Sequence, residues 1–484
     1  MKSRACFLVL LIGFAAAVPV GGQDASQVDD LKKRLVLETK TSGPGKVSTG
    51  YFRTFENRRA GKGREIKLDL VVLHATGDKP QPDPVFVLAG GPGQAAATLW
   101  RQYQNSWMRR DRDIVLVNQR GTGGDNRIQL PPRSDITSPQ DYLRPMFEPE
   151  RIKKALKVLN KKFDLRMYST PDAMDDLNEI RQALGYEKIN LTGGSYGTRA
   201  ALVYIRRHEA TVRTAVLNGV APIEFRNPLY HAQEAQNALD KIFAEVEANQ
   251  TYREAFPNLR KKFDTVLERL EKSPAKVELQ DARSGEVHAV EISKDIFCGS
   301  LRFQMYYLNT TRSVPLLIQR AYEGDFKPFA RNSIARNRAL GNAIALGMLL
   351  SVTAAEDVAR IKAEEIGPAT KGSFYGDSRL RNQIEVCRLW PKSDLPKNFG
   401  DPVKSNVPTL ILSGIIDPVT GPRWGEVVHK NFPNSIHIVA PAAHGVGGSC
   451  IQRIQKAFLD SATVKDLDTS CVKDMKLPPL VLPK

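Results

Sequence analysis

Residues 188–205, KINLTGGSYGTRAALVYI, place one serine between two different hydrophobic patterns. Before Gly193 the apolar residues alternate with polar ones, as in a β-strand, and after Gly197 they follow the period of an α-helix. Ser195 therefore lies on a sharp turn from a strand into a helix. On such a turn the serine adopts a strained backbone conformation, and only small neighbours let the strand and the helix approach closely.

The rest of the chain indicates how this turn is embedded. Short apolar runs typical of buried strands alternate with helical stretches on both sides of it, and a β-hairpin is predicted over residues 47–76. This rhythm predicts an α/β fold with a mostly parallel sheet and helices on both faces. The other predicted strands are residues 85–90, 113–121, 212–219, 407–417 and 435–444.

The strand rhythm stops between residues 223 and 400. Long helical stretches joined by polar loops replace it, with one further hairpin at VELQDARSGEVHAVEI. We interpret this segment as a mainly helical cap inserted into the α/β core. The predicted organisation is therefore a first core segment over 47–222, the cap over 223–400 and a second core segment over 401–484.

The chain begins with the pattern of a secretory signal peptide. Lys2 and Arg4 precede an apolar run over residues 5–18, and small residues follow up to Gly22. Residues 1–22 are too short and wrongly flanked for a membrane anchor, and no later run is long enough to span a bilayer. We expect a soluble protein that is secreted or periplasmic, without membrane insertion, in which residues 24–46 form a loose mature N-terminus.

Cysteine usage agrees with an oxidising compartment. Of the five cysteines, Cys6 leaves with the signal peptide, and Cys450 and Cys471 frame a predicted helix and a loop, which makes them the expected disulfide. Cys298 and Cys387 either pair or stay buried and free. The spacing matches no zinc pattern, so we predict no metal site.

The formal net charge of +17 reflects basic residues that are scattered along the chain. No motif combines basic and aromatic residues in the manner of a nucleic-acid-binding protein. We therefore interpret the charge as a solvated basic surface and expect no nucleic-acid partner.

A serine hydroxyl is a poor nucleophile at neutral pH, so a histidine must take its proton and a carboxylate must orient that histidine. Asp417 follows the apolar run TLILSGII, and His444 follows SIHIVAPAA. The order serine, aspartate, histidine, each after a strand, is that of α/β-hydrolases, so we predict a triad of Ser195, Asp417 and His444. Less suitable alternatives are His429 on a predicted helix, His437 inside a strand and Asp401 before its strand.

Such a triad also needs backbone N–H donors for the oxyanion of the tetrahedral intermediate. One donor is expected from Tyr196, directly after the serine. The other is expected from the glycine-rich loop between the strand VFVLAG and a predicted helix over residues 94–108, where Gly91 is the candidate and Gly90 the reserve.

The combination of AGGPG (89–93), NQRGTGGD (118–125), GGSYGT (193–198), SGIIDPVT (413–420) and AHG (443–445) resembles the proline iminopeptidase and tripeptidyl aminopeptidase family of α/β-hydrolases. The resemblance covers residues from about 50 to 471. It implies a serine exopeptidase that removes N-terminal residues, often proline, from peptides. The chain departs from the family pattern at Ala89, Asn118 and Ala354; the last leaves Cys387 without the partner that similar secreted members have.

By the same resemblance, the cap acids Glu356 and Asp357 hold the free ammonium group of the substrate, with Glu356 the preferred position. A carboxylate there would also penalise peptides with a blocked N-terminus, because it would be left buried and unpaired. The alternative is that the pair is ordinary, solvated surface charge on a helix.

Other residues have expected supporting roles. Arg120 is expected to pair with an acid and brace the loop after its strand. Aromatic side chains that either line a substrate pocket or belong to the core are Trp100, Trp107, Tyr306 and Tyr307.

Three functional hypotheses follow. The first is an exported serine aminopeptidase in which Ser195 attacks the carbonyl, His444 acts as base and then acid, Asp417 orients it, and neither metal nor cofactor is needed. The second is an esterase or another small-molecule hydrolase on the same triad, and the third is a non-catalytic binding protein of the same fold. A cap carboxylate near Glu356 that faces the triad favours the first, because an ester has no ammonium group.

Overall fold

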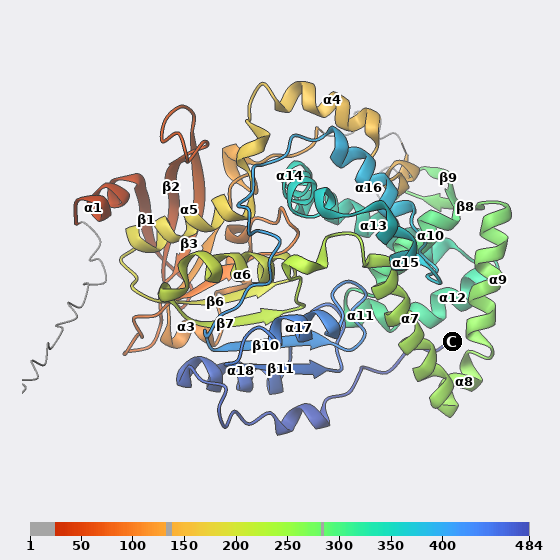
Figure 1. Cartoon of the computed structure of the whole chain (residues 1–484). Coiled ribbons are helices and arrows are strands. Elements are labelled where there is room, and N and C mark those ends of the chain that lie inside the picture. Colours follow the sequence, from red (N-terminus) through yellow and green to blue (C-terminus); the bar gives the residue numbers. More distant parts are fainter. Residues whose placement is uncertain (1–24, 132–137, 282–284, 484) are drawn as a thin grey trace, which may run out of the picture.

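The computed structural model describes residues 25–131, 138–281 and 285–483. The predicted signal peptide, residues 1–22, lies outside the described residues. Within them the chain forms a nine-stranded sheet in the order β1-β2-β3-β5-β4-β6-β7-β10-β11 and a separate hairpin, β8-β9 (Figure 1).

The sheet is mostly parallel. In the order of the sheet, β5, β4, β6, β7, β10 and β11 pair in parallel, and β1, β2, β3 and β5 pair antiparallel. With its helical layers this sheet confirms the predicted α/β-hydrolase fold class. The strands are β1 Leu35–Ser42, β2 Gly45–Phe55, β3 Glu65–Leu73, β4 Val85–Leu88, β5 Ile114–Val117, β6 Ile189–Gly194, β7 Val212–Asn218, β10 Thr409–Gly414 and β11 Ser435–Ala440.

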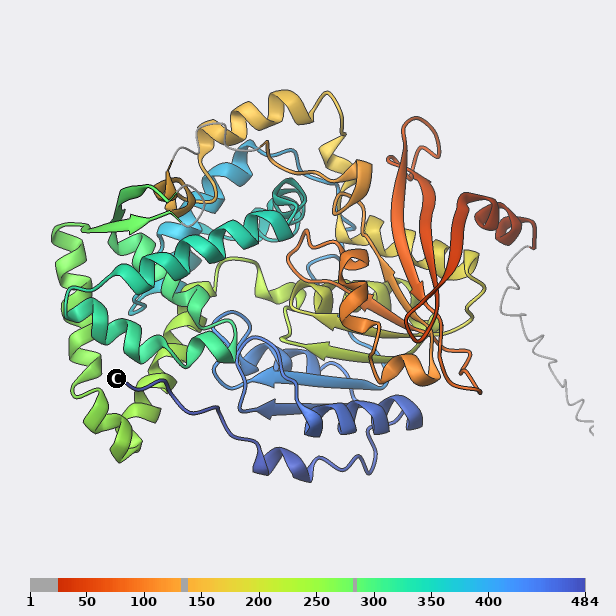
Figure 2. The same ribbon diagram turned by 180° about the vertical axis from the view of Figure 1, so that it is seen from behind.

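Helices cover both faces of the sheet because alternate strand residues point to opposite sides. On β4, Phe86 and Leu88 pack into the larger core cluster with α5 (Thr170–Ala183) and α6 (Tyr196–His208). Val87 packs on the opposite side with the segment 96–108. Figures 1 and 2 show these two layers from opposite sides; further helices are α3 Met108–Asp111, α17 Pro422–His429 and α18 Ser449–Ser461, while α4 Pro149–Leu159 packs on the cap helix α16.

Two local expectations are wrong. The N-terminal segment is ordered: α1 (Ala25–Arg34) packs on α5, and β1 pairs with β2 along its whole length. Leu31, Leu35 and Leu37 supply the apolar contacts that fix this segment to the core. The continuous helix expected after the glycine-rich loop is instead broken into a 3-10 turn (Ala96–Leu99) and the short α2 (Trp100–Tyr103) and α3.

The segment between β7 and β10 is mainly helical and lies beyond the arrowheads of the parallel strands (Figure 1). Most of its helices share a second hydrophobic core with the β8-β9 hairpin (Ala275–Gln280 and Val287–Ile292). The helices are α7 His231–Ala248, α8 Gln250–Ala255, α9 Leu259–Lys272, α10 Lys294–Gln304, α11 Leu308–Thr311, α12 Val314–Tyr322, α13 Lys327–Ala343, α14 Leu346–Glu356, α15 Ala363–Thr370 and α16 Ser378–Leu389.

Helix α14 differs from its neighbours because it packs into the core of the sheet. Its apolar residues surround the helix on all sides, and Leu346, Met348, Leu350 and Val352 belong to the same cluster as α6. The helix ends at Glu356, which is thereby carried into the interior of the protein.

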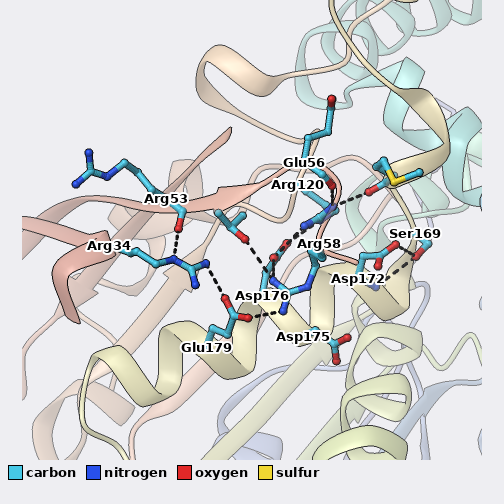
Figure 3. A network of polar contacts seen from close by, with 12 residues as sticks. Arg34, Arg53, Glu56, Arg58, Arg120, Ser169, Asp172, Asp175, Asp176 and Glu179 are labelled. Carbon is cyan, nitrogen blue, oxygen red and sulfur yellow. Dashed lines mark hydrogen bonds and ion pairs between the residues drawn. The ribbon is translucent and has the colours of Figure 1, made fainter. Parts of the chain in front are cut away.

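An ionic network ties the N-terminal elements to α5 (Figure 3). Arg120 is fully buried and donates to both carboxylate oxygens of Asp176 at 2.7 and 3.0 Å, which confirms that it pairs with an acid. Arg58 lies between Asp176 and Glu179, close to one turn apart on α5, and bonds to both. Arg34, at the end of α1, donates to Glu179 at 2.7 Å. The network therefore joins α1, the β2–β3 turn and the loop after β5.

The cysteines divide as expected. Cys450 and Cys471 form a disulfide, and Cys298 and Cys387 are buried and free. Among the described helices none is long and apolar enough to cross a membrane.

The first prediction concerns the contact between α6 and β4. A Cβ on Gly197 would overlap the carbonyl oxygen of Leu88, whereas one on Gly194 meets no atom within 4 Å. We expect Gly197→Ala to lower the free energy of unfolding by more than about 3 kcal/mol, because backbone atoms on both sides must move. Gly194→Ala is the matched control and should change it by less than about 1 kcal/mol. Denaturant unfolding measures both; equal stability of the two variants would contradict the prediction.

Candidate active site

Ser195 has the strained backbone that the sequence predicts. Its φ and ψ are 55° and −124°, outside the regions that ordinary L-residues occupy, and it stands between the end of β6 and the start of α6. Its N–H donates to the carbonyl oxygen of Asn218 at 3.0 Å, and its own carbonyl accepts from the side chain of Thr198 at 2.6 Å. These bonds hold the turn while Gly194 remains exposed beside it.

Asp417 and His444 form a hydrogen-bonded pair. His444 Nδ1 lies 3.0 and 2.9 Å from the two carboxylate oxygens of Asp417. Asp417 also accepts from the backbone N–H groups of Val419 and Thr420 and from the hydroxyl of Thr420 at 2.8 to 2.9 Å. Burial by itself would raise the pKa of Asp417, but His444 and these donors outweigh it, so the pKa lies below its usual value and the carboxylate stays ionised.

The end of β7 brings the serine turn and the histidine together. Asn218 accepts the backbone bond from Ser195, and its side chain exchanges two hydrogen bonds of 2.8 Å with the backbone of Val446, just after His444. The next residue, Gly219, faces the imidazole, where a Cβ would lie 3.3 Å from Cε1 of His444. All these residues follow the carboxyl ends of adjacent parallel strands, where open α/β sheets place their ligand sites.

Tyr306 of the cap contacts the histidine from the other side. Its carbonyl oxygen accepts from the backbone N–H of His444 at 3.0 Å, and the two rings meet edge to face with centroids 5.1 Å apart. Of the aromatic candidates, Tyr306 therefore borders the site, whereas Trp100 packs behind the sheet.

Other histidines in the structure also form hydrogen bonds to a serine, so such a bond does not by itself identify a catalytic pair. Ser48 Oγ lies 2.6 Å from Nε2 of His74, whose Nδ1 lies 3.4 Å from Asp113. Ser48, however, is buried inside the antiparallel strand β2, with no turn to present it. His437, whose position inside a strand makes it a less suitable candidate, bonds to the buried Ser413 at 2.9 Å.

The glycine-rich loop after β4 approaches Ser195 closely. A Cβ on Gly90 would lie 3.3 Å from the carbonyl oxygen of Gly194 and 3.4 Å from Cβ of Ser195, so the loop backbone lies directly against the serine turn. Gly91 has a φ of 111°, which favours glycine. On its far side the loop binds the cap, because Ala345, between α13 and α14, donates its N–H to the carbonyl of Gly93 at 2.9 Å.

Glu356 is buried directly behind the serine turn. Its carboxylate accepts from the backbone N–H of Thr170 at 2.6 Å and from the Thr170 hydroxyl at 2.7 Å. The same hydroxyl lies 2.7 Å from the phenol oxygen of Tyr196, the residue after Ser195. Burial raises the pKa of Glu356 to about 7, although Arg199 and Thr170 favour its ionised form.

Asp357 is also buried and forms an ion pair of 2.7 Å with Arg199 on α6. The interpretation of these two acids as solvated surface charge is therefore wrong: α14 ends inside the protein, which the acidic pair alone does not reveal. Sequence reasoning also missed Thr420 and Thr170, since a single threonine in a loop or at a helix start carries no distinctive pattern.

No group of three or more His, Cys, Asp or Glu side chains is arranged to hold a metal ion within the part of the chain that the structure describes.

The chain is similar in sequence to several named proteins. A family model described as TAP-like protein matches residues 372–471. The YuaR hydrolase of Escherichia coli (strain K12) is 23% identical over 333 residues, 63% of this chain and 62% of that protein, so this chain spans less than two thirds of it. The serine protease Hip1 of Mycobacterium tuberculosis (strain ATCC 25618 / H37Rv) is 24% identical over 454 residues, 84% of each chain.

Shorter and more distant similarities accompany these. The proline iminopeptidase of Xylella fastidiosa (strain 9a5c) is 26% identical over 141 residues, 29% of this chain and 33% of that protein. Among solved structures, the serine hydrolase CCSP0084 from Cycloclasticus zankles aligns with 86% of this chain and 98% of its own at a TM-score of 0.38 and 12% identity. The matches to named proteins confirm the predicted resemblance: this chain is similar to the proline iminopeptidase and tripeptidyl aminopeptidase group of α/β-hydrolase serine peptidases.

Proposed function

We propose that this protein is an exported serine exopeptidase that releases N-terminal residues from peptides. The observation that carries the proposal is the ionised Asp417 bonded to His444 beside the strained, partly exposed turn at Ser195. The similarity to proteins named as peptidases favours peptides over other substrates. The predicted signal peptide and the disulfide support the periplasm or the medium as its location.

In the proposed reaction Ser195 Oγ attacks the carbonyl carbon of the scissile bond, and Nε2 of His444 takes the hydroxyl proton. The imidazole then gives that proton to the leaving amine, which produces an acyl-enzyme and a free amine. Water, activated by the same nitrogen, hydrolyses the acyl-enzyme and restores Ser195. Asp417 holds Nδ1–H of His444 and stabilises the imidazolium, and Thr420 fixes Asp417 in turn.

The negative charge of the tetrahedral intermediate needs two backbone donors. We assign one to Tyr196, whose N–H belongs to the first turn of α6 and has no partner within the helix. We assign the other to Gly91, with Gly90 as the alternative because it lies closest to Ser195.

Glu356 is the proposed partner of the substrate ammonium group. Asp357 is committed to Arg199, whereas Glu356 has only neutral donors from Thr170 and lies next to Tyr196. A buried carboxyl with a pKa near 7 loses its proton readily when an ammonium ion approaches, since the ion pair replaces the missing hydration. A blocked N-terminus offers no such compensation.

A second candidate function is an ester or other small-molecule hydrolase on the same residues. The observation that favours it is the complete burial of Glu356 and its two bonds to Thr170, which give the carboxyl a structural use without any substrate.

The main test is hydrolysis of a fluorogenic panel by the mature protein: free Pro, Ala and Ala-Ala-Pro amides, their N-acetylated forms and an aryl ester. We expect cleavage of the free-amine amides, with kcat/KM lowered by at least about 10⁴-fold in Ser195→Ala and by about 10³- to 10⁴-fold in Asp417→Asn. If only the ester reacts, or free and acetylated amides are cleaved alike, the aminopeptidase proposal fails and the second candidate stands.

The role of Glu356 has its own prediction. Glu356→Gln keeps the size of the side chain but removes its charge, so kcat/KM for free-amine amides should fall by about 10- to 100-fold, while ester hydrolysis changes by less than about threefold. Glu364→Gln, an exposed acid on α15, is the matched control and should alter neither rate. Equal losses for amide and ester would identify Glu356 as a structural support of the serine turn.

Glu356→Gln should also change how the free energy of unfolding depends on pH. Because the folded-state pKa of Glu356 lies near 7 and its ordinary value is 4.5, the folded protein binds this proton more tightly than the unfolded chain. The contribution of the protonated Glu356 carboxyl to the free energy of unfolding is therefore complete below pH 4.5 and is lost as the pH rises to 7. The free energy of unfolding of Glu356→Gln, relative to that of wild type, should therefore rise by about 1 to 3 kcal/mol between pH 4.5 and 7.5. Urea unfolding at several pH values measures this; a difference independent of pH would contradict it.

A further inference from the structure

A cleft of about 760 Å³ opens in the cap between α10, α13, α16 and the segment 138–146. Among the residues that the structure describes, four arginines and two aspartates line it, a formal excess of two positive charges. One of the aspartates, Asp141, is already paired with Arg144 at 2.8 Å. The cleft therefore presents a positive lining, which an anionic group would neutralise.

Arg379 on α16 is one of these lining arginines, and it forms no ion pair with an aspartate or glutamate among the described residues. Its guanidinium lies 4.9 Å from the ring centroid of Phe147, and its buried Nη1 has no hydrogen-bond partner. The nearby Asp377 pairs with Arg381 instead. Burial lowers the pKa of Arg379, as expected for a cation that lacks a counter-ion.

Arg302 on α10 lies one layer deeper, behind Tyr375 of the cleft wall. It is 1% exposed, its guanidinium lies 5.9 Å from the ring centroid of Tyr375, and its Nε has no partner. Its Nη2 donates to the hydroxyl of Tyr306 at 2.9 Å. Because Tyr306 contacts His444, Arg302 connects the cleft with the candidate active site.

His231, the first residue of α7, completes this group. It is 6% exposed, and neither of its ring nitrogens has a hydrogen-bond partner. Burial and the positive charges of Arg302 and Arg379 hold its pKa well below 6.5, so its neutral ring keeps one donor and one acceptor. The buried Arg302 and His231 and the partly exposed Arg379 thus each have a buried polar atom without a hydrogen-bond partner, which is uncommon in folded proteins.

We propose that Arg302 and Arg379, with His231 beside them, form a binding site for a carboxylate group of the substrate. Within the described residues neither arginine forms an ion pair with an aspartate or glutamate, and the buried Nε of Arg302 and Nη1 of Arg379 have no hydrogen-bond partner. A guanidinium can pair with a carboxylate through two parallel hydrogen bonds, which would supply both the counter-ion and the missing acceptors. The inference rests on the proposed peptidase function, because in peptides the anionic group is a carboxylate.

Two parts of a peptide can supply that carboxylate: an acidic side chain, or the C-terminus of a short peptide. Together with Glu356, which we assign to the ammonium group, the site would select peptides that carry both charges at a fixed separation. Specificity would then come from the pairing of protein charges of opposite sign with the ammonium group and the carboxylate of the substrate.

The kinetic test uses matched peptides. One arm compares Ala-Ala-Glu and Ala-Ala-Gln fluorogenic amides; the other compares Ala-Pro-Ala with its C-terminal amide. We expect wild type to favour the charged member of at least one pair by about tenfold or more, and Arg379→Gln to remove most of that preference while the neutral member changes by less than about threefold. The preferred arm identifies the source of the carboxylate.

The control is Arg381→Gln, which removes one positive charge from the same helix at an exposed position already paired with Asp377. It should keep the preference. A second variant, Arg379→Lys, keeps the charge without the planar fork and should retain part of it. Absence of preference in both arms, or the same preference in wild type and Arg379→Gln, would overturn the proposal.

Binding to Ser195→Ala, measured by calorimetry with the same peptides, separates this proposal from the proposed function. If wild type cleaves none of the peptides but Ser195→Ala binds the charged ones more tightly, and Arg379→Gln in that background abolishes the difference, the carboxylate site stands and the peptidase proposal fails. If the peptides are cleaved but neither rate nor affinity responds to their negative charge, the carboxylate site fails and the peptidase proposal stands.

Discussion

The close approach of α6 to β4 is the constraint on which the rest of this structure depends. Gly197 at the start of α6 faces the carbonyl of Leu88 so closely that no Cβ fits between them, and Gly193 faces the backbone of Gly197 in the same way. The chain can make this turn only if Ser195 takes a positive φ, which holds the serine at the carboxyl edge of the sheet. The ends of β4, β7, β10 and β11 then supply the glycine-rich loop, Asn218, Asp417 and His444.

Buried charges form a second level of organisation around this turn. Arg199 on α6 is paired with Asp357, and Glu356 supports Tyr196 through Thr170, so the helix that follows Ser195 is fixed from below by polar groups. On the other side, Arg120 and Asp176 join the loop after β5 to α5. Removal of one partner from such a pair leaves an uncompensated charge in the interior, so these contacts specify one arrangement of the loops even where their net stabilisation is small.

The cap contributes charged side chains of both signs. Its carboxylate at Glu356 and its arginines at positions 302 and 379 lie on separate elements, α14, α10 and α16. Tyr306 links the arginine side to His444, and Thr170 links the carboxylate side to the turn at Ser195. In our proposals, recognition of both charges of a short peptide is thus connected to the two groups that carry out proton transfer and attack.

The sequence by itself determined the strands, the strained serine turn and the order of Ser195, Asp417 and His444, because hydrophobic period and glycine placement are local properties. It also indicated the bonded pair of Cys450 and Cys471. It did not reveal that residues 25–42 are ordered, since a helix and an edge strand with few apolar residues depend on partners distant in sequence. Only the tertiary structure decided that Glu356 and Asp357 are buried and that Arg302 and Arg379 lie close enough to His231 to lower its pKa, because burial and charge pairing arise from the packing of separate elements.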